Sequence, residues 1–252
     1  MAFPNIIFGP SGQQFARTTD RRWPLGTQLI LQDGRKFRYG GAGATAVAAG
    51  LLMQTPLAPS TAVAQTFTSA HAVGARDLSM TLVGTSRATN SLQGGYMQIE
   101  DNQGGGGHIY LIDSNTRGAT TSSAVTVTLT PGEGLAVAVL AGNTASFSES
   151  PYKNFIVHPS PPTARVLGWT ATSLTSNFFG WLGTAGLVSG LSDGTLVVNN
   201  MAWASASVDG AVAPQTTAVF TTPALNQLAP VARVHLVGAT TGFSMLNAVL
   251  DQ

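Results

Sequence analysis

The sequence predicts an all-β protein, with an antiparallel sandwich-like or jelly-roll-like body that follows an extended N-terminal arm. From about residue 61 onward, apolar and polar residues alternate in short runs, the pattern of strands with one buried face. Glycine, proline, serine and asparagine separate these runs, and no stretch combines helical periodicity with capping residues. Residues 1–58 lack the regular alternation, which sets them apart from the remainder of the chain.

We therefore expect two parts, an arm over residues 1–58 and a β-rich body over residues 59–252. In the arm, apolar residues are scattered among prolines and glycines, and a basic stretch, ARTTDRRWPLG, follows them. The dipeptide Asp33-Gly34 predicts a hairpin turn within TQLILQDGRKFRY. We expect this arm to be extended and to have little core of its own. The proline-rich stretch 159–165 is the expected seam between two subdomains of the body.

The body shows its clearest alternation in SAVTVTLTPGEGLAVAVLAG, residues 123–142. Val125, Val127 and Leu129 share one face of a predicted strand, and a Pro-Gly turn precedes a second apolar run that begins at Leu135. This pattern predicts an antiparallel hairpin with one packed face and one solvated face. Further strands are expected over residues 62–68, 78–83, 155–158, 166–169, 178–182, 196–199, 218–221 and 234–237.

The chain is unusually poor in charge, and its few charges are unevenly placed. Charged residues make up 9% of the sequence, against roughly 25% in typical soluble domains. Residues 1–40 carry a net charge of +4 and the remainder −3. Such a composition favours a protein that covers much of its surface with partners. The absence of cysteine excludes disulfides, thiolate metal sites and cysteine nucleophiles, and no segment predicts a membrane-spanning helix.

A glycine-rich segment, GGYMQIEDNQGGGGHIYLIDSN (residues 94–115), resembles a phosphate-binding loop at first sight. A P-loop needs a helix and a Gly-Lys-Ser/Thr sequence after the glycines, whereas β-type runs flank them here and no lysine is near. The segment therefore predicts a hairpin with a glycine-rich tip. The alternative is a small metal or acid–base site formed by His108 with Glu100, Asp101 and Asp113, although their spacing fits no ligand motif.

A short catalytic motif also matches, because residues 190–194 read Gly-Leu-Ser-Asp-Gly and fit G-x-S-x-G. The nucleophile elbow requires a strand before the serine, here Ser192, and a helix after it. The residues that follow, TLVVNN, predict a strand, so Asp193-Gly194 is better interpreted as a hairpin turn. A hydrolase that uses Ser192 or His108 stays open as an alternative class.

The basic residues of the arm lie beside aromatic ones, an arrangement that serves either nucleic-acid or protein recognition. Six basic groups, partly offset by two acidic groups, form a small electrostatic footprint, and the pI of about 8.2 is below that typical of nucleic-acid binders. Protein contact without direct binding of nucleic acid is the favoured interpretation.

The aromatic residues of the body offer a further alternative, a sugar-binding platform, against the usual role of tryptophan in filling β-protein cores. They are Trp169, Trp181, Trp203 and Tyr110.

Three stretches resemble a class of virion proteins. DGRKFRYGGAGATAVAAGLL, PYKNFIVHP and GLVSGLSDGTLVV look like the decoration (cement) proteins on the outer capsid surface of tailed bacteriophages. The resemblance implies β-rich bodies, frequent assembly into homotrimers, contact with the major capsid protein, and no catalytic residues or cofactors. It also implies assembly in the host cytoplasm and residence on the virion.

These observations together predict a non-enzymatic structural protein that stabilises an icosahedral capsid by binding the outer surface of the major capsid protein. We expect the arm to make the contact. A phage tail or spike component, or a carbohydrate-binding β module, is the alternative. The predicted capsid-contact residues are Phe8, Arg17, Arg21, Arg22, Trp23, Arg35, Phe37, Arg38 and Tyr39.

Overall fold

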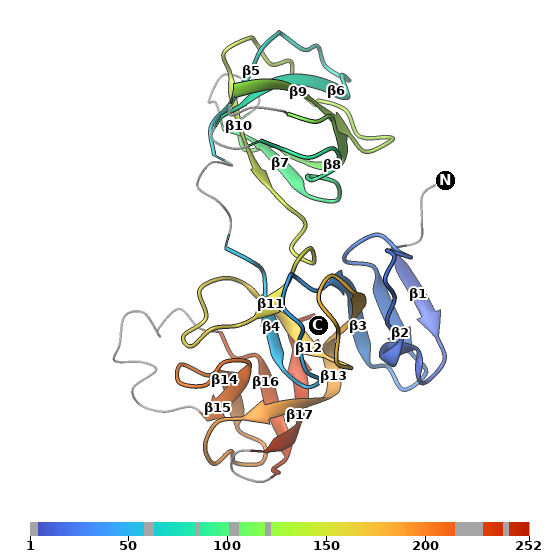
Figure 1. The fold of residues 1–252 in the computed structure, drawn as a ribbon, viewed down its shortest axis with the longest axis vertical. Helices are drawn as coiled ribbons and strands as arrows, with labels where there is room; N and C mark the ends of the chain where they lie inside the picture. Colours follow the sequence, from blue (N-terminus) through green and yellow to red (C-terminus); the bar gives the residue numbers. More distant parts are fainter. Residues whose placement is uncertain are drawn as a thin grey trace. The chain divides into compact units, whose positions relative to one another are not determined.

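The protein is all-β, as the alternation predicts, and its strands form two compact units (Figure 1). The computed structural model describes residues 5–57, 63–83, 86–100, 106–118, 122–214, 229–238 and 242–251. Within these ranges there is a single short 3₁₀ helix, η1 (Gln13–Phe15), and no α-helix. Unit 1 combines Met1–Leu57 with Tyr152–Gln252, and unit 2 is the intervening segment Ala58–Pro151.

Unit 2 is a closed six-stranded barrel, drawn in cyan to yellow-green in Figure 1. Its strands follow the order β10-β5-β6-β9-β8-β7 around the barrel, and every neighbouring pair is antiparallel. Alternate side chains of these strands fill one core that includes Met80, Val127 and Phe147. The strands are β5 (Gln65–Phe67), β6 (Asp77–Val83), β7 (Tyr96–Ile99), β8 (Ile109–Asn115), β9 (Ser122–Leu129) and β10 (Thr144–Ser148).

Two hairpins predicted in this region have different outcomes. The glycine-rich segment does join two antiparallel strands, β7 and β8, as predicted. The hairpin expected over residues 123–142 is wrong, because β9 pairs with β6 and β8 and no strand begins at Leu135. Leu135 and Val139 are nevertheless buried in the barrel core, so their apolar character reflects packing and not a strand ladder. Val139 makes only an isolated bridge to His71.

Unit 1 is built on one large sheet in which β17 pairs with β13 as well as with β16. As a result β13, β15, β14, β16 and β17 form a closed ring around a second core that includes Val212, Val234 and Leu246. The strands of unit 1 are β1 (Ile6–Gly9), β2 (Gln28–Leu31), β3 (Lys36–Gly41), β4 (Leu52–Gln54), β11 (Ile156–Val157), β12 (Val166–Thr170), β13 (Phe179–Ser192), β14 (Met201–Ala204), β15 (Ala211–Pro214), β16 (Ala232–Leu236) and β17 (Phe243–Val249).

The structure does not confirm an extended N-terminal arm. The predicted hairpin exists as β2 and β3, but β3 pairs along its length with β13, so the first 57 residues belong to the sheet of unit 1. Leu29, Phe37 and Tyr39 are buried against Trp181 in a core of their own. The seam predicted at residues 159–165 is also no boundary, because Gln54 Oε1 accepts hydrogen bonds from backbone N–H groups of that stretch.

The remaining predicted strands are present except in two places. Residues 196–199 form a loop and turn, in which Leu196 packs inward while Val197 and Val198 are exposed. The strand expected at 218–221 lies outside the described residues. A jelly-roll-like sandwich is likewise not confirmed, because the strands close into rings within each unit.

Candidate functional site

The nine predicted contact residues fall into three groups: aromatic residues that are buried or partly buried, arginines paired within unit 1, and exposed residues. Phe37 and Tyr39, from β3, are 3% and 1% exposed and therefore cannot touch a partner in this fold. The Tyr39 ring lies 5.0 Å from that of Trp181 and 5.2 Å from that of Trp23, which is itself partly buried. Trp23 also lies 5.4 Å from Trp181. The rings of Trp23, Tyr39 and Trp181 form a packed aromatic cluster, and Phe37 belongs to the same core. Trp23, Phe37 and Tyr39 therefore support the fold beneath the solvent-exposed surface and offer a partner little or no contact area.

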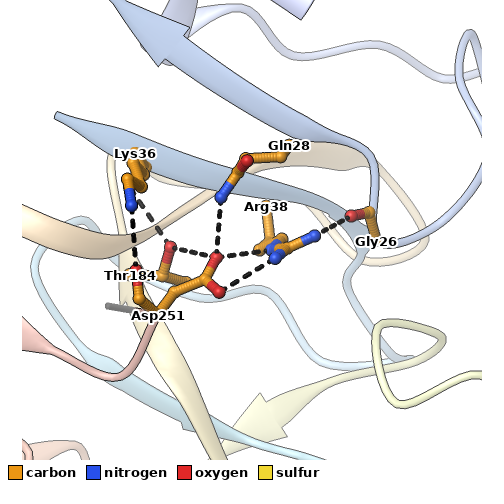
Figure 2. A network of polar contacts seen from close by, with 6 residues as sticks. All are labelled: Gly26, Gln28, Lys36, Arg38, Thr184 and Asp251. Carbon is orange, nitrogen blue, oxygen red and sulfur yellow. Dashed lines mark hydrogen bonds and ion pairs between the residues drawn. The ribbon is translucent and has the colours of Figure 1, made fainter. Parts of the chain in front are cut away.

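Arg38 is engaged inside unit 1, as Figure 2 shows. Its guanidinium holds the carboxylate of Asp251 through two hydrogen bonds, Nε–Oδ2 of 2.6 Å and Nη2–Oδ1 of 2.9 Å. Gln28 Nε2 donates to the same carboxylate at 3.1 Å, and Thr184 Oγ1 at 3.4 Å. The hydrogen bonds from Arg38 hold the pKa of Asp251 below its ordinary value, while partial burial acts in the opposite direction. This network, here called the Asp251 clamp, ties the end of the chain to β2, β3 and β13.

Arg35 is also paired within its own turn. Its Nε lies 2.7 Å from Asp33 Oδ2, and its guanidinium carbon lies 5.9 Å from the centre of the Phe37 ring. The pKa of Asp33 is lowered, first by the backbone N–H of Arg35 that its carboxylate accepts. Arg35 is therefore held within the β2–β3 turn by its ion pair with Asp33.

Four predicted residues remain on the surface: Phe8, Arg17, Arg21 and Arg22. Phe8 is 83% exposed on β1, which among the described strands lies at the end of its sheet and pairs with β2 alone. Together with Ile6, which is also exposed, these residues are called the exposed N-terminal set below. Ile6 and Phe8 expose apolar side chains on a strand at the edge of the sheet, an arrangement that soluble monomers usually avoid.

The loop that carries the arginines is anchored to the aromatic cluster. The backbone N–H of Arg22 donates to the Tyr39 hydroxyl at 3.1 Å, and the Thr18 hydroxyl lies 3.2 Å from the same oxygen. Thr18 also exchanges backbone hydrogen bonds with Phe179, the first residue of β13. The loop is therefore fixed at its base, and fixing it before binding reduces the entropy that association costs.

A second feature of unit 1 is a groove of about 1060 Å³, which sequence reasoning did not find. It lies between η1, the β2–β3 turn and the outer face of β13, β16 and β17. Its exposed apolar residues are Phe15, Leu187, Leu236, Phe243 and Met245. The signal in the sequence is weak, because FSMLNAV (residues 243–249) carries apolar side chains on both faces and does not stand out as a strand.

The alternative catalytic and metal sites gain no support from the geometry. His108 is exposed, and its Nδ1 lies 3.4 Å from the Tyr110 hydroxyl, whereas Asp101 falls outside the described residues. The described residues contain no group of three or more His, Cys, Asp or Glu side chains arranged to hold a metal ion. Ser192 is buried at the end of β13 with its hydroxyl donating to Ser244 Oγ at 2.7 Å, and a loop follows it where an elbow needs a helix.

The aromatic platform proposed for sugar binding is not on the surface. Trp169, Trp181, Trp203 and Tyr110 are all buried, so their rings have no face to offer a carbohydrate, and the core interpretation of these residues is confirmed. Searches of family models, curated proteins and solved structures found nothing that matches this chain. No helix among the described residues is long and apolar enough to span a membrane.

Proposed function

We propose that this chain is a non-enzymatic structural protein of a virion, which decorates an icosahedral capsid by binding the outer surface of the major capsid protein. The observation that carries the proposal is the exposed N-terminal set, in which Phe8 is exposed on β1 and the arginine loop is hydrogen-bonded to the aromatic cluster. Aromatic and arginine side chains dominate binding energy at protein interfaces. A chain with so little charge also gains by burying its surface against a partner.

In this proposal the contact residues are a subset of those expected from the sequence. Phe8 and Ile6 would fill apolar depressions between capsid subunits, while Arg17, Arg21 and Arg22 would meet carboxylates or carbonyl oxygens around them. The aromatic cluster and the Asp251 clamp hold this surface in place. Homotrimers around a local symmetry axis would multiply the contacts, and each added interface above roughly 1,000 Å² would resist rupture of the shell.

A co-sedimentation assay tests the proposal, using the full chain and expanded empty capsids of the tailed phage that encodes it. We expect saturable binding of the native chain and at least a tenfold loss of affinity in the triple variant Phe8→Ser, Arg21→Ser, Arg22→Ser. The matched control is Val197→Ser with Val198→Ser, which removes exposed apolar side chains from another loop of unit 1. Failure of the native chain to bind, or equal binding by the triple variant, would overturn the proposal.

A further inference from the structure

The groove of unit 1 has an apolar floor where a solvated sheet face is normally polar. Along β17, Ser244 and Leu246 point into the ring, whereas Phe243 and Met245 point outward and are 51% and 40% exposed. Leu187, opposite Asn247 on the neighbouring strand, continues the apolar surface. The outer face of this part of the ring therefore exposes apolar side chains at every second position along the strand, as expected where alternate residues point to opposite faces.

The same groove exposes part of the backbone of β13. Pairing with β3 ends at Ala185, opposite Lys36, and pairing with β15 begins only at Leu191, opposite Ala211. Between these points β13 has β17 on one side, and no strand of the described ranges pairs with the other side. Gly186 lies at one end of this gap, and Gly50, which accepts the N–H of Leu191, lies at the other end. Both glycines line the groove, and so do Leu187–Ser189.

The hydrogen bonds that flank the gap show which backbone groups face it. Leu191 donates its N–H to Gly50 O and Asp193 to Val212 O, both away from β17, whereas Ser192 donates toward β17, to Gly242 O. Because N–H and C=O directions alternate along a strand, Leu187 and Ser189 direct theirs into the gap. Within the described chain, no backbone hydrogen bond satisfies either residue on that side.

We propose that this groove binds an extended peptide strand of another protein, which adds to the open edge of β13. The backbone of an extended peptide has C=O and N–H groups at the spacing needed to pair with the N–H and C=O groups of this edge. An acyl chain has no such groups and would leave the backbone of β13 without hydrogen-bond partners there. Its alternate side chains would pack on Phe243, Met245 and Leu187. The gap spans five residues, 186–190, roughly 16 Å, and admits a short strand.

The charges around the groove define the chemistry of that peptide further. Asp33 and Arg35 lie at one end but neutralise each other at 2.7 Å. A neutral peptide with apolar residues at alternate positions is therefore the expected occupant. The chain's own exposed apolar strand, β1, is already paired with β2, so the strand is assigned to a different protein. This site shares no residue with the exposed N-terminal set and is independent of the proposed function.

A peptide-binding assay on the full chain tests this site. The probe is a pool of fluorescent five-residue peptides with Val, Ile, Leu or Phe at alternate positions and Thr between them. The tightest binders are then compared with analogues N-methylated at the amides that would pair with β13, because N-methylation removes the backbone donors but keeps the side chains. We expect saturable binding, weakened at least tenfold by N-methylation.

Two variants of one residue provide the matched pair. Ser189→Pro removes an N–H that faces the gap and takes no part in the β17 ladder, a position at which strands tolerate proline, and should weaken binding at least tenfold. Ser189→Ala keeps the N–H and should bind within about twofold of the native chain. If no peptide binds below about 1 mM, or if N-methylated peptides bind equally well, the proposal is wrong. Self-association that Ser189→Pro abolishes would also overturn it, by showing that a second copy fills the groove.

Discussion

Removal of the Asp251 carboxylate should destabilise unit 1, because four side-chain hydrogen bonds of the Asp251 clamp end on it. Asp251→Ala deletes both hydrogen bonds from Arg38 and those from Gln28 and Thr184, and it removes the carboxylate that faces the Arg38 guanidinium. The Arg38 and Asp251 side chains are each 26% exposed, so water compensates for part of the loss. Breaking a fully buried pair costs about 3–5 kcal/mol and an exposed pair about 0.2–1 kcal/mol. We therefore expect a loss of about 2 kcal/mol for Asp251→Ala.

The assay is urea denaturation followed by tryptophan fluorescence at pH 7. All four tryptophans, at positions 23, 169, 181 and 203, belong to unit 1, so the signal reports on that unit alone. The matched control is Asp20→Asn, which neutralises an exposed carboxylate of the same unit and should change stability by less than about 0.5 kcal/mol. An effect of Asp251→Ala as small as that of the control would show that the Asp251 clamp does not stabilise unit 1.

The pH dependence provides a second readout of the same clamp. The pKa of Asp251 is lowered in the folded protein, chiefly by hydrogen bonds from Arg38, so the folded state favours the ionised carboxylate. Its contribution to stability is present above the pKa of the unfolded state, at about pH 4, and is lost as pH falls through the folded pKa. The native chain should therefore lose more stability between pH 5 and 3 than Asp251→Ala does. Parallel pH profiles would contradict this assignment.

Three further predictions concern stability and are measured by the same urea denaturation, or by thermal unfolding for unit 2. Gly50→Ala should destabilise unit 1 by about 1–2 kcal/mol, because Gly50 has φ +75° and a Cβ there would lie 2.7 Å from the Phe243 ring; an unchanged midpoint would contradict the geometry. Gln54→Leu should lower the free energy of unfolding by about 1–3 kcal/mol, because it removes the oxygen that accepts the N–H groups of Thr163 and Ala164; an unchanged stability would mean that water replaces the amide. Residues 58–151, expressed alone, should unfold cooperatively because the barrel has its own core; a non-cooperative melt would show that it depends on unit 1.

The sequence alone was sufficient for the fold class but not for the strand partners. Alternation is local, so β6, β9 and β12 could be predicted from their own residues. The pairing of β3 with β13 joins residues about 140 positions apart, and nothing near either strand encodes it. For this reason residues 1–57 resembled an arm, when in fact their core partner, Trp181, comes from the second half of the chain.

The same limit applies to the candidate site. Exposure of Phe8 and of the arginine loop agrees with an interface formed by those residues, but the sequence could not separate them from Phe37 and Arg38. Arg38 forms an ion pair with Asp251, which lies 213 positions away in the chain. The groove depends on where two ladders of β13 stop, which is a property of the assembled sheet and not of any motif.

If the proposed function is correct, the chain is a structural protein of a tailed phage, and a cryo-EM reconstruction of the purified virions tests this most directly. We expect density for both units on the outer shell around local symmetry axes, with Phe8 and the loop bearing Arg21 and Arg22 against the major capsid protein. Absence of the chain from the shell, or binding with β1 and that loop facing solvent, would overturn the proposed function.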